Sequence, residues 1–186
     1  GLGSRVWVRD QLFIKPDRSW IGRVVNALGQ PIDGIAPLAD GPRSLTIDSE
    51  PLQPMSLDRV RRPCNTGVRA IDLARSKGFD TLVVALVAER AREVREFIED
   101  VIQASGARAV TVVATSSESA MMRKLSAKTA MTIAEYFRDE GDNVLLVVDS
   151  VTRYAHAVRE VALAAGELPV ARGYTPSVFA ELPRLL

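Results

Sequence analysis

The feature that most constrains the fold of this sequence is an alternation of apolar, strand-like runs with helical segments after residue 80. Residues 81–87 form a continuous apolar and β-branched run, which is typical of a strand buried on both faces. Two similar runs cover residues 109–114 and 144–148. Because parallel strands need long crossover connections, the alternation predicts an α/β fold with a mainly parallel sheet flanked by helices.

Helical periodicity follows each of these runs. Apolar residues recur at intervals of three or four over residues 94–102, 119–139 and 151–162. Gly141 and Gly166 come just after the second and third segments, where a left-handed residue commonly ends a helix. The sequence therefore predicts a helix after each of these strands, packed on the faces of the sheet.

The first 66 residues have a different character. Prolines and turn pairs such as Asp33-Gly34 separate short β-type pieces, of which residues 6–8 and 21–25 are examples. This half is predicted to be an irregular β-containing segment of short strands and long loops, without an amphipathic helix. The chain starts without Met and ends on apolar residues, so we expect it to be a fragment.

Composition narrows the classes of partner. Lys plus Arg number 24 and Asp plus Glu number 23, so a net charge of +1 gives no electrostatic reason to expect nucleic acid or anionic lipid. The longest apolar run, residues 82–88, is too short to span a membrane. The single cysteine, Cys64, has no second Cys or His at ligand spacing, so no zinc site is expected.

Two acids stand at the ends of predicted strands, where ligands of parallel sheets bind. Asp149 directly follows a buried strand, which is the Walker B pattern of an acid that orders Mg²⁺ beside phosphates. Glu89 ends another strand and could orient a water that attacks the γ-phosphate, with Arg90 stabilising the transferred phosphoryl group. The alternative interpretations are that Asp149 caps the next helix, and that Glu89 and Arg90 are a solvated first helical turn.

Several segments, in the correct order and spread over almost the whole chain, resemble the ATPases of flagellar and type III protein export. This family is similar to the catalytic subunit of rotary ATP synthases. The segments are residues 20–34, 62–72 before the phosphate-binding loop, 86–97 with the catalytic glutamate, 149–155 with Walker B, and 173–179 in the loop that follows.

The resemblance implies a role for each site residue. Glu89 would act on the attacking water with Arg90 beside it, and Asp149 would be the Mg²⁺ acid. Tyr174 would pack against the adenine of ATP, and the cofactors would be ATP and Mg²⁺. Residues 1–19 would end an N-terminal barrel, and residues 20–186 would form an incomplete RecA-like ATPase core.

The resemblance also implies a function and partners. The protein would be a cytoplasmic homo-hexamer, peripheral to the inner membrane at the export gate. ATP hydrolysis would drive protein export, with the flagellar branch favoured by residues 153–157 and 173–174. Partners would be stalk and regulator proteins, secreted substrates and chaperones. The alternatives are an injectisome export ATPase, a nucleotide-binding but non-catalytic subunit of a rotary-type ATPase, and a RecA-like RNA translocase.

The sequence departs from the family in one large respect, the absence of the Gly-rich P-loop that ends in Gly-Lys-Ser/Thr. Ile71-Asp72 runs directly into Leu73-Ala74, so a strand, the loop and most of a helix are skipped. We expect a stretch to be missing from the sequence here, with a chain break within residues 70–75 and most directly between 72 and 73. The alternative is that the protein truly lacks this segment. The family also usually has Gly where this chain has Ala88 and Ala91, so either Ala is expected to be strained if its φ is positive.

Overall fold

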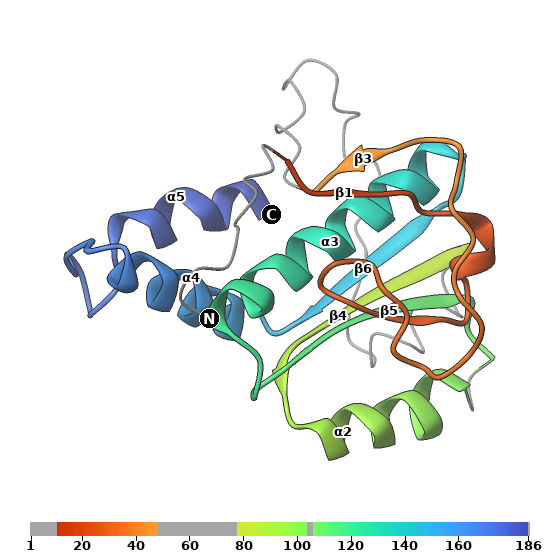
Figure 1. Ribbon diagram of the computed structural model, residues 1–186, viewed down its shortest axis with the longest axis horizontal. Coiled ribbons are helices and arrows are strands. Elements are labelled where there is room, and N and C mark those ends of the chain that lie inside the picture. Colours follow the sequence, from red (N-terminus) through yellow and green to blue (C-terminus); the bar gives the residue numbers. More distant parts are fainter. Residues whose placement is uncertain (1–10, 48–77, 104–105, 186) are drawn as a thin grey trace, which may run out of the picture.

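The computed structural model describes residues 11–47, 78–103 and 106–185, and a parallel sheet of four strands lies at its centre (Figure 1). The strand order is β2-β5-β4-β6 and each pairing is parallel. The α/β class and the three predicted strands are confirmed, and each strand is one or two residues longer than its apolar run. The bounds are Val24–Asn26 for β2, Thr81–Glu89 for β4, Ala109–Thr115 for β5 and Val144–Asp149 for β6.

Helices cover both faces of the sheet (Figure 1). Alternate residues of β4 belong to two apolar clusters, one shared with α3 and α4 and the other with α2, because successive side chains of a strand point to opposite faces. No helix in the described ranges is both long and apolar enough to cross a membrane. The helices are α2 (Ala91–Glu96), its π-helical continuation η3 (Phe97–Gln103), α3 (Ala120–Asp139) and α4 (Val151–Ala164).

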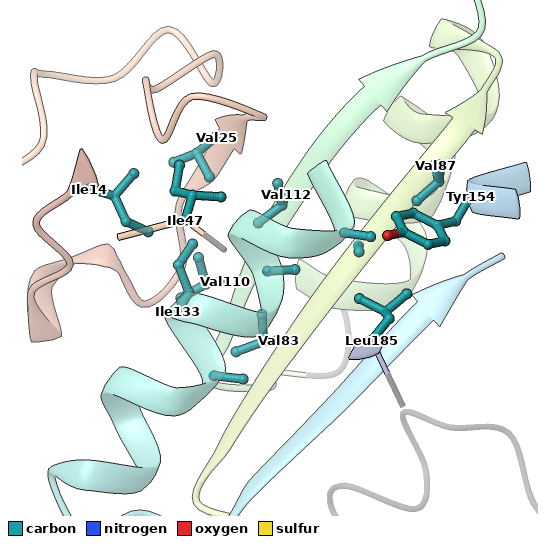
Figure 2. Packing of buried hydrophobic residues seen from close by; sticks show 14 of the residues in the cluster. Ile14, Val25, Ile47, Val83, Val87, Val110, Val112, Ile133, Tyr154 and Leu185 are labelled. Atoms are coloured by element: carbon teal, nitrogen blue, oxygen red, sulfur yellow. The ribbon is translucent and has the colours of Figure 1, made fainter. Parts of the chain in front are cut away.

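The larger apolar cluster lies between the sheet and α3. Figure 2 shows Val83 of β4 and Val110 of β5 beside Ile133 of α3. Val83, Val110, Ile133 and Phe137 are all fully buried. These β-branched and aromatic side chains therefore fix α3 across the sheet. Because β4 and β6 are parallel, the loops that follow them lie at the same edge of the sheet.

The boundaries of α3 follow from its caps. Ser119 accepts a hydrogen bond from the backbone N–H of Met122 at 3.3 Å, so it fills the N-cap. Gly141, just past the last helical turn, has φ 95°, a value that a residue with a Cβ adopts only with strain. The predicted stop at Gly141 is confirmed, and it returns the chain to β6.

The N-terminal segment contains short strands and loops, as predicted for its described part. Strands β1 (Phe13–Ile14) and β3 (Leu45–Thr46) pair antiparallel, with the 3₁₀ turn η1 (Arg18–Trp20) between them along the chain. The short strand expected at residues 6–8 lies outside the described residues. The strand expected at 21–25 is observed as Val24–Asn26, and its pairing with β5 was not evident from local pattern.

An ion pair holds the loop that follows β2. Arg23 Nε donates to Asp33 Oδ2 at 2.7 Å, and the backbone N–H of Val24 donates to the same oxygen at 3.0 Å. The hydrogen bond from Arg23 holds the pKa of the Asp33 carboxyl far below its usual range, against the opposing effect of burial. Arg23 and Asp33 thereby fix this turn-rich segment against the parallel sheet.

The segment 173–179 was interpreted as a loop, and the structure corrects this from Pro176 onward. Helix α5 (Pro176–Leu185) lies beside α4. Proline is favoured at the first helical position because its missing N–H would have no intrahelical partner there. The Glu167 carboxylate accepts from the Ser177 backbone N–H at 3.2 Å and from the Ser177 hydroxyl at 2.7 Å, which completes the helix start.

An ionic cluster fastens α5 to α3 and α4. The Glu181 carboxylate lies 2.6 Å from Lys124 Nζ and 2.9 Å from Lys128 Nζ, both on α3. Tyr154 of α4 donates its hydroxyl to the same carboxylate at 3.1 Å. Burial raises the pKa of Glu181, but the hydrogen bonds and charges of the two lysines outweigh burial and lower that pKa to about 2.

Acidification should remove the stabilisation that this cluster supplies. The folded pKa of Glu181 is depressed from 4.5 to about 2, so its contribution is complete above about pH 4.5 and is lost as the pH falls toward 2. We expect a loss of about 1–2 kcal/mol, because water still reaches these side chains. Urea unfolding from about pH 7 to about pH 3 measures it, and an equally steep loss in the Glu181→Gln variant would contradict the assignment.

Candidate active site

An irregularity in the pairing of β4 with β5, near the end of β4, sets the direction of the Glu89 side chain. The register with β5 shifts between Val87 and Glu89, and Glu89 lies opposite Thr115. Ala88, at the shift, has φ 59°. A bulge turns the next side chain out of the regular alternation and is common beside active sites. Alanine is strained at a positive φ, so the strain expected at Ala88 is present. Ala91 is the first residue of α2 and has no positive φ.

Replacing Ala88 with Gly should raise the free energy of unfolding by about 0.5–1 kcal/mol. Glycine adopts positive φ without a Cβ clash, and this gain exceeds the larger entropy that Gly has in the unfolded chain. Ala91→Gly is the matched control and should destabilise, because Ala91 is helical. Urea unfolding of both variants measures the difference, and a destabilised Ala88→Gly protein would refute the strain.

Arg153 of α4 reaches across the sheet edge to Glu89. Its guanidinium forms an ion pair with Glu89 Oε1 and donates to the Ala88 carbonyl oxygen at 3.0 Å. The Glu89 side chain is 14% exposed. The hydrogen bond to Glu89 raises the pKa of Arg153, and the charges of Glu89, Asp149 and Glu93 act in the same direction after it. The arginine therefore lies among three carboxylates.

Sequence reasoning did not select Arg153. Its position four residues after Asp149, in the first turn of a helix that follows a strand, is the signal that was available. In that position a long side chain reaches the end of the neighbouring strand.

Asp149 ends β6 at the same edge of the sheet, opposite Leu86 of β4. The cap of α4 is Ser150, whose hydroxyl accepts from the backbone N–H of Arg153 at 3.4 Å. The alternative interpretation of Asp149 as the helix cap is therefore wrong. The carboxylate of Asp149 is exposed at the end of its strand, where a ligand can reach it.

Arg90 turns toward α2. Its backbone N–H lies 3.4 Å from Glu93 Oε2, and its guanidinium lies 3.7 Å from Glu93 Oε1. The side chain is 76% exposed. Arg90 is thus beside Glu89 in sequence, but its side chain pairs with a surface acid.

Tyr174 lies in the turn between α4 and α5 and contacts side chains of α4. Its hydroxyl is 3.1 Å from His156 Nε2, and the Arg159 guanidinium lies 5.8 Å from the centroid of its ring. The two rings of His156 and Tyr174 are stacked with centroids 6.0 Å apart. The structure therefore brings Glu89, Asp149 and Arg153 together and gives Tyr174 a separate set of neighbours.

The acids at this edge fit a magnesium ion that is held mainly by water and phosphate. In the described ranges no group of three or more His, Cys, Asp or Glu side chains is arranged to hold a metal. Mg²⁺ commonly keeps several waters and uses one or two carboxylates together with substrate phosphates. Asp149, exposed at the end of β6, suits that kind of coordination.

The outer edge of β6 lacks a neighbour in the described part of the chain. Residues 144–148 are all apolar yet only half-buried, and β6 pairs with β4 alone among these residues. The expected break between residues 72 and 73, with the missing P-loop, lies outside the described residues. An apolar strand with one open edge is what remains when a neighbouring strand is taken from a parallel sheet.

Known proteins are similar to this chain in sequence and in fold. The sequence matches the nucleotide-binding domain of the ATP synthase alpha/beta family over residues 31–186. The flagellum-specific ATP synthase of Agrobacterium fabrum is 52% identical, with 100% of this chain and 45% of the relative covered. The type 3 secretion system ATPase of Xanthomonas euvesicatoria is 43% identical, with 89% of this chain and 44% of the relative covered.

Solved structures of type III secretion ATPases have a similar fold. The ATPase EscN of the enteropathogenic E. coli type III secretion system, solved with its central stalk EscO, superimposes with a TM-score of 0.83 and 37% identity. That match covers 95% of this chain and 50% of EscN. The chain thus spans about half the length of the relatives it matches.

The alignment with the Agrobacterium protein runs over 213 positions against the 186 residues of this chain, so the relative carries residues that this chain lacks. The resemblance to flagellar and type III export ATPases is confirmed by these relatives. Sequence match, parallel sheet and structural likeness together establish that this chain belongs to the ATP synthase alpha/beta family and forms part of its nucleotide-binding domain.

Proposed function

We propose that the whole protein hydrolyses ATP with Mg²⁺ to drive protein export through a type III apparatus, with the flagellar branch favoured. The observation that supports this best is the placement of Glu89 and Asp149 at the ends of β4 and β6, with Arg153 beside Glu89. The flagellum-specific relatives favour the flagellar branch over an injectisome.

In the proposed reaction Glu89 accepts a hydrogen bond from the attacking water and orients it toward the γ-phosphate. Arg153 positions the Glu89 carboxylate by pairing with one of its oxygens, and the Ala88 carbonyl fixes the guanidinium in turn. Asp149 would hold Mg²⁺, and the ion would supply positive charge that neutralises the phosphates. Arg90 can serve the transferred phosphoryl group only after leaving Glu93.

Tyr174 is proposed to stack on the adenine ring. Stacking of this kind contributes about 1–3 kcal/mol per base. An adenine ring would share or replace the contacts that His156 and Arg159 make with the Tyr174 side chain. The proposed division of the chain is an N-terminal barrel that ends near residue 19 and an ATPase core that begins near residue 20.

The proposed partners are other copies in a hexamer, a stalk protein, regulators, chaperones and secreted substrates, at the cytoplasmic side of the export gate. EscN, a structural relative, is assembled and binds the central stalk EscO. The near-neutral charge of this chain gives no support for a nucleic acid partner.

An ATPase assay of the full-length protein with and without Mg²⁺ tests the proposal. We expect turnover that requires the metal and is unchanged by added RNA. ATP binding without turnover would favour a non-catalytic subunit, and stimulation by RNA would favour a translocase. Either result would overturn the proposed function.

A further inference from the structure

Arg159, in the C-terminal half of α4, is an arginine without a hydrogen-bond acceptor among the described residues. No carboxylate of the described residues lies within ion-pair distance of it, and its Nε atom is closed off from water without a hydrogen-bond partner. Burying a donor without a partner costs about 1–3 kcal/mol. Arg159 therefore stands out as a cation whose partner is missing.

Other arginines of the described ranges do not share this condition. Most pair with a carboxylate, as Arg123 does with Glu160 at 2.8 Å. The remaining ones are exposed, so water satisfies their nitrogen atoms, and they are Arg92, Arg108, Arg172 and Arg184. Among the arginines that the structure describes, only Arg159 combines an unpaired charge with a desolvated nitrogen.

Two neighbours limit where the Arg159 guanidinium can lie. Its carbon lies 5.8 Å from the centroid of the Tyr174 ring, and the Tyr174 hydroxyl is in turn 3.1 Å from His156 Nε2. Gly173, with φ 77°, brings the backbone of the 171–174 turn close, since a Cβ there would lie 3.9 Å from an Arg159 nitrogen. A guanidinium fixed by stacking loses little entropy when it binds a planar oxyanion.

We propose that Arg159 forms, with Tyr174 and His156 beside it, a binding site for a carboxylate or phosphate oxyanion outside the Glu89–Asp149 centre. The two terminal nitrogens of the Arg159 guanidinium are not closed off as Nε is, and they can meet two oxygens of such a group. Charge-assisted hydrogen bonds of this type are short and strong. The oxyanion comes from a free small anion or from an acidic side chain of a second copy of the chain. The site shares Tyr174 with the proposed adenine contact, so its test is run without nucleotide and does not depend on ATP turnover.

The test follows the guanidinium itself. Full-length protein labelled with ¹⁵N-arginine is studied by NMR in chloride buffer at constant ionic strength, without nucleotide, and titrated with acetate and with inorganic phosphate. The Nε–H signal of Arg159 is assigned from its absence in Arg159→Lys. If that variant does not fold, the perturbation caused by Tyr174→Phe identifies the signal in the wild-type spectrum.

We expect the Arg159 signal to shift and saturate with a midpoint about tenfold lower than that of Arg172, the exposed control arginine. A second arm dilutes the protein in chloride buffer and follows its sedimentation. A shift of the Arg159 signal on dilution, with weaker self-association of Arg159→Gln than of Arg172→Gln, assigns the oxyanion to a second copy. If the chemical shift of the Arg159 Nε–H signal does not change with acetate, with phosphate or on dilution, the proposal is overturned.

Discussion

Replacing Glu89 with Gln should lower ATP turnover by the full-length protein by about 10²- to 10⁴-fold, the range that a positioned general base contributes. The substitution keeps the size of the side chain but removes the negative charge and the basicity that orient and activate water. Nucleotide affinity should change little, because Glu89 acts on the water and not on the nucleotide. Steady-state turnover and nucleotide titration measure the two quantities separately.

Glu96→Gln is the matched control, because Glu96 is an exposed acid on the neighbouring helix α2. Its turnover should stay close to that of the parent protein. Urea unfolding of both variants excludes a general loss of structure, since Glu89→Gln also leaves Arg153 without its charged partner. Retained turnover in Glu89→Gln would end the catalytic assignment of this residue.

Inserting a strand and Gly-rich P-loop segment at the place where we expect it to be missing, between Asp72 and Leu73, should raise the free energy of unfolding by about 3 kcal/mol or more. The partly exposed apolar side chains at residues 144–148 would then be covered, and the gain sums over several of them because full burial of one Val or Leu contributes about 1.5–3 kcal/mol. The insertion should also create nucleotide binding, because backbone N–H groups of a Gly-rich loop cradle phosphates. Urea unfolding and ATP titration of the 186-residue chain with and without the segment measure both effects.

A Gly/Ser segment of the same length at the same place is the control. It adds chain length without an apolar strand, so it should give neither the stability nor the binding. Equal stability of the two insertions would mean that no strand joins the open edge of β6. Tight ATP binding by the chain without an insertion would mean that the phosphates are held by other residues.

Much of the fold could be predicted because its strands are buried on both faces. Runs such as 81–87 and 109–114 have no polar alternation, and only the interior of a parallel sheet suits them. Helix α3 was bounded correctly because Ser119 and Gly141 are local start and stop signals. The short strand β2 was harder, because its place beside β5 depends on contacts made across the sheet.

The candidate site was predicted in part. Glu89 and Asp149 follow apolar strands directly, so their place at one edge was visible from the sequence. The ion pair of Arg153 with Glu89 depends on the bulge at Ala88 and on the direction in which α4 leaves the sheet. The neighbours of Tyr174 depend on the turn before α5, which local periodicity did not reveal.

The charges around Arg153 bear on how a triphosphate can enter this part of the molecule. Among the described side chains, two guanidiniums, those of Arg153 and Arg90, lie beside the carboxylates of Glu89, Asp149 and Glu93, so acids outnumber bases where phosphates would arrive. A bare polyanion meets repulsion there, whereas the same nucleotide with its divalent cation brings the counter-charge with it. If the proposed function holds, these charges would favour the metal complex over free nucleotide before any chemistry begins.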